Sequence, residues 1–106
     1  MKPNEAAIAG KRVTFRERFS LRENRDLPRA LAACGEEDTE QNNKIAVLSR
    51  CIDSWEFPGS PSDAAAYEDL DLFTEFVPLM VALGEYLQAR MGNLSTTAKN
   101  LASASS

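Results

Sequence analysis

The stretch from Asp69 to Met91 limits most strongly what this chain can fold into. Its large apolar residues recur at steps of three and four positions, which keeps them on one side of a helix with 3.6 residues per turn. They are Phe73, Phe76, Met80, Leu83, Leu87 and Met91. Leu72, Val77 and Leu79 widen this side. We therefore predict one long amphipathic helix, whose broad apolar face is covered partly by the earlier helices and leaves room for another protein.

Two residues inside this stretch affect the helix. Pro78 has no N–H to donate to the carbonyl of Thr74, so we expect either a kink or a break there. Gly84 costs about 1 kcal/mol of helix stability relative to alanine and permits another backbone to come close. The sequence leaves open which side of the helix is exposed.

Three shorter helical elements are predicted ahead of it. Ser20 and Glu23 have the spacing of a capping box, so a first helix should follow, and Pro28 predicts a kink or restart within it. A second helix is predicted from about Thr39 to Trp55, because apolar residues again recur at helical spacing. They are Ile45, Leu48, Cys51, Ile52 and Trp55. A short helix is predicted from Pro61 to about Glu68.

The two ends of the chain differ from this helical middle. Residues 1–10 show no periodicity and are predicted to be a flexible arm. From Lys11 to Phe19 apolar and basic residues alternate, which predicts a strand with a basic outer face. Such a strand either covers the domain's own core or pairs as an edge with a neighbour in an assembly. Residues 93–106 are rich in Ser, Thr, Ala and Asn and are predicted to be a flexible tail.

The predicted fold is therefore mainly α. We expect a small bundle of three to four helices with one short N-terminal β-strand or extended arm, and residues 11–92 form a single helical domain.

No arrangement of residues in this sequence specifies a reaction. The chain has no histidine, and it has no phosphate-binding glycine loop or nucleophile motif. Cys34 and Cys51 occupy apolar positions of predicted helices, so we expect reduced, buried thiols. Four carboxylates at the start of the last helix are explained by the helix dipole: Glu68, Asp69, Asp71 and Glu75. We expect no catalytic residue, no cofactor and no metal site, and hence no enzyme.

Charge and hydropathy limit the partners. Residues 1–35 carry eight Lys/Arg and four Asp/Glu, whereas residues 36–90 carry three and twelve. This dipolar pattern favours self-association and protein partners, and its acidic half makes nucleic acid an unlikely partner. No apolar run is long enough to span a bilayer, and the N-terminus lacks the apolar core of a signal peptide. We expect a cytoplasmic chain without membrane contact.

Several segments resemble a known family. The run from Arg12 to Glu17, followed by Ser20 to Arg25, resembles the opening of small tail-assembly chaperones of long-tailed bacteriophages and prophages, in which a short strand precedes an arginine-rich helix. The segment from Leu48 to Gly59 is similar to their helix that ends in a Ser-Trp pair before a glycine turn, and Asp69 to Leu72 also fits. The resemblance covers about residues 11–91.

This resemblance implies a function without catalysis. Members of that family are thought to coat the tape-measure protein and to help recruit tail-tube subunits around it. The opposite charges of the two halves of this chain are compatible with many copies lining a long helical client, and we expect this to take place in the cytoplasm of a bacterial host. The alternative is a small structural virion protein, such as a head–tail or tail-tube-associated subunit. A third hypothesis is a regulatory protein that contacts nucleic acid through its N-terminal arginines. These are Arg12, Arg16, Arg18, Arg22, Arg25 and Arg29.

We predict that protein partners bind at the apolar face of the last helix, at a groove beside the single tryptophan, and at the basic side of the first helix. That basic side is otherwise only a solvated surface, and Trp55 otherwise closes the core at the end of its helix. The candidate partner-binding residues are Trp55, Phe57, Phe73, Phe76, Met80, Leu83, Leu87, Arg22, Arg25 and Arg29.

Overall fold

The computed structural model describes residues 2–90 and begins with a hairpin. Strand β1 (Glu5–Ile8) pairs antiparallel with β2 (Lys11–Phe15), and Ile8 lies opposite Lys11. The two residues between them, Ala9 and Gly10, have φ angles of 52° and 79°. Positive φ at both central residues is the condition for the tight type I′ turn, whose twist suits two paired strands.

A third strand completes the sheet. Helix α3 (Asn42–Cys51) passes directly into β3 (Ile52–Trp55), which pairs antiparallel with β2 in the strand order β1-β2-β3. Trp55 lies opposite Val13, and Ile52 lies opposite Phe15, with a bulge between these pairs. The extra residue of the bulge lets both Ile52 and Trp55 face inward, although their spacing of three would otherwise put them on opposite faces of a strand.

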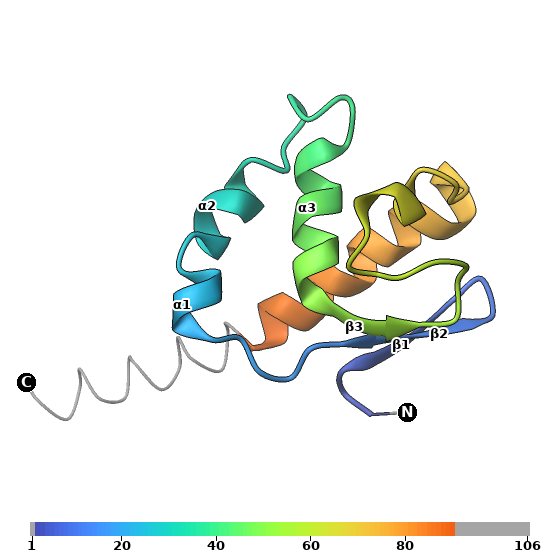
Figure 1. Ribbon diagram of the computed structural model, residues 1–106, viewed down its shortest axis with the longest axis horizontal. Coiled ribbons are helices and arrows are strands. Elements are labelled where there is room, and N and C mark those ends of the chain that lie inside the picture. The colour runs from blue at the N-terminus through green and yellow to red at the C-terminus, as the bar shows by residue number, and fades with distance from the viewer. Residues whose placement is uncertain (1, 91–106) are drawn as a thin grey trace, which may run out of the picture.

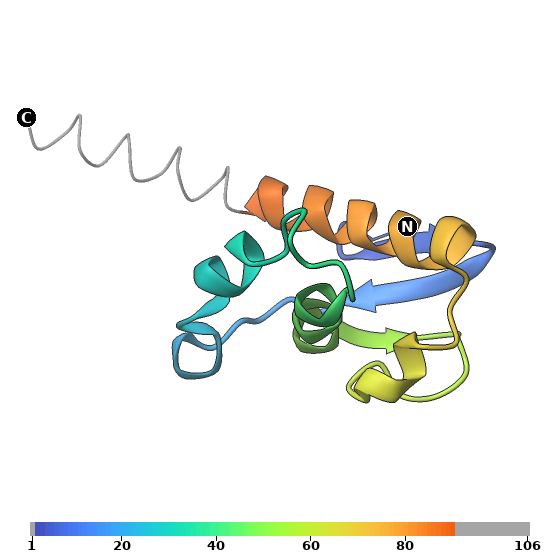
Figure 2. The same ribbon diagram turned by 90° about the horizontal axis from the view of Figure 1, so that it is seen from above.

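The fold is therefore α+β, and the prediction of a mainly helical bundle with one strand is wrong. Residues 5–8, predicted as part of a flexible arm, form β1. Residues 52–55, predicted as the end of a helix, form β3. Figures 1 and 2 show α3 and the last helix on the same face of the sheet. The other face carries polar side chains, among them Arg12, Thr14 and Ser54.

The first predicted helix is divided in two. Helix α1 (Leu21–Asn24) is capped by Ser20, whose hydroxyl accepts a hydrogen bond from the backbone N–H of Glu23 at 3.1 Å. Helix α2 (Leu27–Ala32) begins one residue before Pro28. Both the cap and the restart at Pro28 are thus confirmed, because proline fits the first turn of a helix and not its interior.

The segment after β3 is held by its aromatic residues. The short 3₁₀-helix η1 (Ala64–Tyr67) is capped by Asp63 and brings the ring of Tyr67 to 4.8 Å from that of Trp55. The indole N–H of Trp55 donates to the carbonyl of Gly59 at 2.9 Å, and the Tyr67 hydroxyl donates to the carbonyl of Pro61 at 2.6 Å.

The last helix, called here the late helix, comprises residues 72–90. Its first turn, η2 (Leu72–Phe76), is a π-turn in which the N–H of Phe76 donates to the carbonyl of Asp71 at 2.8 Å, and α-helix follows from residue 77 to residue 90. The wider turn lies directly before Pro78, where the α-helical ladder lacks a donor. The helix therefore continues past Pro78.

The core lies between the sheet, α3 and the late helix (Figure 2). Its most deeply buried side chains are Val13, Phe15, Val47, Leu48, Cys51, Ile52, Leu79 and Leu83. Among residues 2–90, no helix is long and apolar enough to cross a membrane. Met91 and the predicted tail, residues 93–106, lie outside the described residues.

Candidate protein-binding surface

The late helix exposes a row of large apolar side chains, which we call the outer stripe. Phe73 is 79% exposed, Val81 54%, Leu72 46% and Val77 45%. Phe73, Val77 and Val81 are four residues apart and share one side of the helix. Gly84 extends this side, and a Cβ atom there would meet nothing within 4 Å. Contiguous apolar surface of this kind is typical of a site where another protein binds.

The outer stripe exists because the apolar residues of the late helix cover more of its circumference than the core can bury. Phe76, Leu79, Leu83 and Leu87 turn inward and are buried against the sheet and α3. The residues of the stripe fall outside that arc, so no part of the described chain covers them.

The start of the outer stripe is held in place by its N-cap. The carboxylate of Asp71 accepts hydrogen bonds from the N–H of Phe73 at 3.2 Å, and from the N–H and hydroxyl of Thr74 at 2.8 and 2.7 Å. The hydrogen bonds from Thr74 hold the pKa of Asp71 below its ordinary value. The exposed ring of Phe73 therefore stands on an ordered first turn.

The structure divides the apolar residues that were predicted to bind partners. Phe73 is exposed and Met80 half-buried. The remaining apolar candidates lie in the core and are not accessible to a partner in the folded chain. They are Phe57, Phe76, Leu83 and Leu87. Val81 was missed by the sequence reasoning, although its position four residues after Val77 was the available signal.

Trp55 is half-buried, and its contacts are internal. Besides Tyr67, its ring meets that of Phe57 edge-on, with the centroids 5.4 Å apart. Since its N–H already donates to Gly59, the indole joins β3 to the following loop and η1. The structure thus gives Trp55 a packing role.

The predicted basic side of the first helix is interrupted. Arg22 lies in α1, Arg29 in α2, and Arg25 between them, and all three are exposed. Asp26 accepts two hydrogen bonds from Arg50, at 2.8 and 3.2 Å. Figures 1 and 2 place α1 and α2 at the opposite end of the molecule from η2, so these arginines and the outer stripe are separate surfaces.

The arginines near β2 share their surroundings with carboxylates. A shallow hollow of about 450 Å³ on the polar side of the sheet is lined by both charges. Its charged residues are Lys2, Arg16, Arg18, Glu5, Glu17 and Asp53. Such a mixed surface attracts phosphate groups weakly, because the carboxylates repel them.

Within the described part of the chain, no group of three or more Cys, Asp or Glu side chains is placed to hold a metal ion. Comparisons of the chain with models of protein families, with curated proteins and with solved structures gave no match.

Proposed function

We propose that this chain is a non-enzymatic binding protein, and that it acts as a phage tail-assembly chaperone which binds the tape-measure protein and helps recruit tail-tube subunits in the cytoplasm of a bacterial host. The outer stripe carries the first part of this proposal. The second part rests on the resemblance of residues 11–91 to such chaperones.

The outer stripe suits a helical client. Phe73, Val77, Val81 and Gly84 follow one another along one side of a helix over about 17 Å, at a rise of 1.5 Å per residue. A client helix with its own apolar stripe can lie along this side, and Gly84 lets the two backbones come close. Several copies of the chain placed along a long helical client would shield its apolar surface from water.

The test is co-expression with a phage tape-measure protein, followed by pull-down and sizing of the soluble complex. The wild-type chain should give a soluble complex that contains many copies of it. Val81→Asp should abolish the complex, because it places a charge on the apolar contact while valine and aspartate have similar helix propensities. Ala46→Asp is the matched control, because Ala46 is also exposed but belongs to another helix, α3.

Two results would overturn the proposal. If the Val81→Asp protein forms the complex as well as wild type does, the outer stripe is not the binding surface. If no complex forms and the chain is found in finished particles at a fixed ratio, the structural virion protein replaces the chaperone.

A further inference from the structure

Strand β1 leaves one of its edges open. The N–H of Phe15 donates to the carbonyl of Asn4 at 2.7 Å, and this register directs the backbone groups of Asn4, Ala6 and Ile8 toward β2. The alternate residues, Glu5 and Ala7, direct theirs away from it. The N–H of Glu5 is used by the carbonyl of Lys2 at 3.0 Å. The Glu5 carbonyl and both backbone groups of Ala7 thus face an edge that no strand within residues 2–90 covers.

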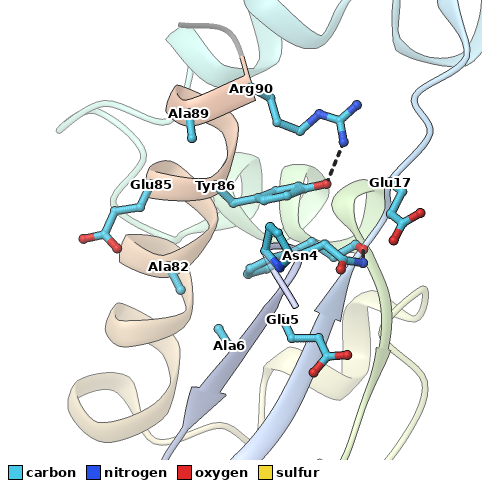
Figure 3. A pocket seen from close by; sticks show the side chains of 11 residues that line it. Asn4, Glu5, Ala6, Glu17, Ala82, Glu85, Tyr86, Ala89 and Arg90 are labelled. Atoms are coloured by element: carbon cyan, nitrogen blue, oxygen red, sulfur yellow. Dashed lines mark hydrogen bonds between the residues drawn. The ribbon is translucent and has the colours of Figure 1, made fainter. Parts of the chain in front are cut away.

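A hollow of about 910 Å³ lies between the start of β1 and the late helix (Figure 3). Phe15 and Tyr86 line it with stacked rings whose centroids are 5.2 Å apart. Three of the lining residues are alanines, whose small side chains fill little of the space: Ala6, Ala82 and Ala89.

This hollow is preformed, because hydrogen bonds hold its lining from both sides. The Tyr86 hydroxyl donates to the carbonyl of Arg16 at 2.7 Å and accepts from Arg90 at 3.0 Å. The side-chain amide of the buried Asn4 donates to the carbonyl of Phe15 at 2.9 Å. A ligand would therefore meet an ordered wall and would lose little free energy in ordering it.

The rim of the hollow is acidic. Figure 3 shows the carboxylates of Glu5, Glu17 and Glu85 around the hollow rather than over its centre. Arg90 is the cation of the lining, and its guanidinium is directed to the hydroxyl of Tyr86. Glu5 lies 4.0 Å from the guanidinium of Arg12, and Glu17 also borders the hollow of about 450 Å³ with its arginines. Glu17 and Glu85, on either side of the Tyr86 ring, are therefore the carboxylates that favour a positively charged side chain of a partner.

We propose that the open edge of β1 and this hollow form a second docking site, which binds an extended segment of a partner protein carrying a lysine or arginine. The segment adds to β1 as a fourth strand through the backbone groups of Glu5 and Ala7. Alternate side chains then enter the hollow, and the basic one is attracted by Glu17 and Glu85, which Figure 3 shows on opposite sides of the Tyr86 ring. This site is separate from the outer stripe, so it does not depend on the proposed function.

The experiment selects random twelve-residue peptides displayed on yeast against the full chain, and then measures the affinity of selected synthetic peptides by fluorescence anisotropy. We expect selected peptides to share a basic residue flanked by small or apolar ones. Ala7→Pro removes the N–H that points away from β2, and it leaves the hydrogen bonds between β1 and β2 in place. It should raise the Kd for the selected peptides at least tenfold. Ala7→Val keeps that N–H and should leave Kd unchanged.

The charge requirement is tested separately. The double variant Glu17→Lys/Glu85→Lys should weaken binding of the basic peptides, whereas Glu36→Lys/Glu37→Lys, the same charge change between α2 and α3, should not. Val81→Asp should bind the peptides as wild type does, which distinguishes this site from the outer stripe.

The proposal is overturned if no peptide is enriched, if the enriched peptides lack a basic residue, or if a folded Ala7→Pro protein binds them as tightly as Ala7→Val. If Ala7→Pro fails to fold, hydrogen exchange of the wild-type Ala7 amide decides. Strand addition predicts that bound peptide slows this exchange, and an unchanged rate contradicts it.

Discussion

The hydroxyl of Tyr86 donates a hydrogen bond to the backbone carbonyl of Arg16 at 2.7 Å, across 70 positions of sequence. This bond joins the late helix to the chain just after β2. Behind it, the Tyr86 ring stacks on that of Phe15 at an interplanar angle of 20°. This side chain, together with the buried Phe76, Leu79, Leu83 and Leu87, holds the late helix over the sheet and so orients the outer stripe.

Tyr86→Phe should lower the free energy of unfolding by about 1–2 kcal/mol, because the ring packing stays while the carbonyl of Arg16 loses its donor in a partly buried site. Urea denaturation followed by circular dichroism measures this change. A stability equal to that of wild type would mean that water replaces the hydroxyl at no cost.

Phe76→Asp and Phe73→Asp should behave oppositely, although only three residues separate them. Phe76 is 5% exposed, so a carboxylate there should cost at least about 3 kcal/mol and unfold the domain. Phe73 is 79% exposed, so its replacement should change stability by no more than about 0.5 kcal/mol. Thermal melts of the two variants side by side decide; equal losses would contradict the inward and outward assignment.

Gly59→Ala should destabilise the fold more than Gly10→Ala. Both glycines have positive φ, 83° and 79°, so both substitutions carry a backbone cost of about 1–2 kcal/mol. A Cβ at Gly59 would also lie 2.9 Å from the Cβ of Ala66, whereas one at Gly10 meets nothing within 4 Å. We expect about 1–3 kcal/mol of additional loss at Gly59, measured by urea denaturation.

The fluorescence of Trp55 provides a second check on Gly59→Ala, because the indole N–H of Trp55 donates to the carbonyl of Gly59. Gly59→Ala should shift the fluorescence emission of Trp55, and Gly10→Ala should not. Equal emission spectra and equal losses of stability would show that the loop moves away from Ala66 without cost.

Asp38 should make stability depend on pH in the acid range. Burial of its carboxylate acts to raise the pKa, but the N–H donors of Asn43 and Lys44 at 3.1 and 3.0 Å and the charge of Lys44 outweigh it and hold the pKa below the ordinary 3.8. The folded protein therefore keeps this carboxylate charged more readily than the unfolded chain does. The resulting stability is present above pH 3.8 and is lost as the pH falls through the lower, folded pKa.

Unfolding free energies of wild type and Asp38→Asn between pH 6 and pH 2 test this linkage. Asp38→Asn should be less stable at neutral pH and should lose less stability on acidification than wild type. Glu37→Gln, an exposed neighbour, is the control and should follow the wild-type curve. Parallel curves for wild type and Asp38→Asn would contradict the prediction.

The two thiols should react at different rates. Cys51 is buried, and burial raises its pKa to about 11. Cys34 is only partly buried, although burial and the nearby Asp38 raise its pKa as well. In the folded protein at pH 8, iodoacetamide should modify Cys34 first, as followed by mass spectrometry, and both thiols should react in urea. Equal rates before unfolding would contradict the burial of Cys51.

The local signals of the sequence were reliable where a neighbouring residue decides the structure. Ser20 caps α1, and Pro28 lies in the first turn of α2. Both effects are local, because the hydroxyl of Ser20 bonds to its own helix and the missing N–H of Pro28 affects only its own turn. The periodicity from Asp69 onward predicted the late helix, which begins at Leu72, because helical spacing can also be read from residues close together in the sequence. Its wide apolar face also indicated a surface that the chain itself does not cover.

The errors arose where distant pairing decides. Ile52 and Trp55 fit a helical spacing, yet they form a strand because the edge of β2 supplies hydrogen-bond partners and a bulge turns both side chains inward. The segment Glu5–Ile8 is too short and too poor in large apolar residues to show a strand pattern, and the turn at Ala9-Gly10 brings it onto β2.

For the outer stripe, too, the sequence determined one part and the tertiary structure another. The sequence by itself determined that the late helix is amphipathic and that its apolar residues exceed what one core face can bury. Only the tertiary structure decided that Phe76 points inward and Phe73 outward, because that depends on where the sheet, α3 and the Tyr86 contact hold the helix about its own axis. Periodicity fixes the angles between side chains on a helix, whereas packing against other elements fixes which of them face water.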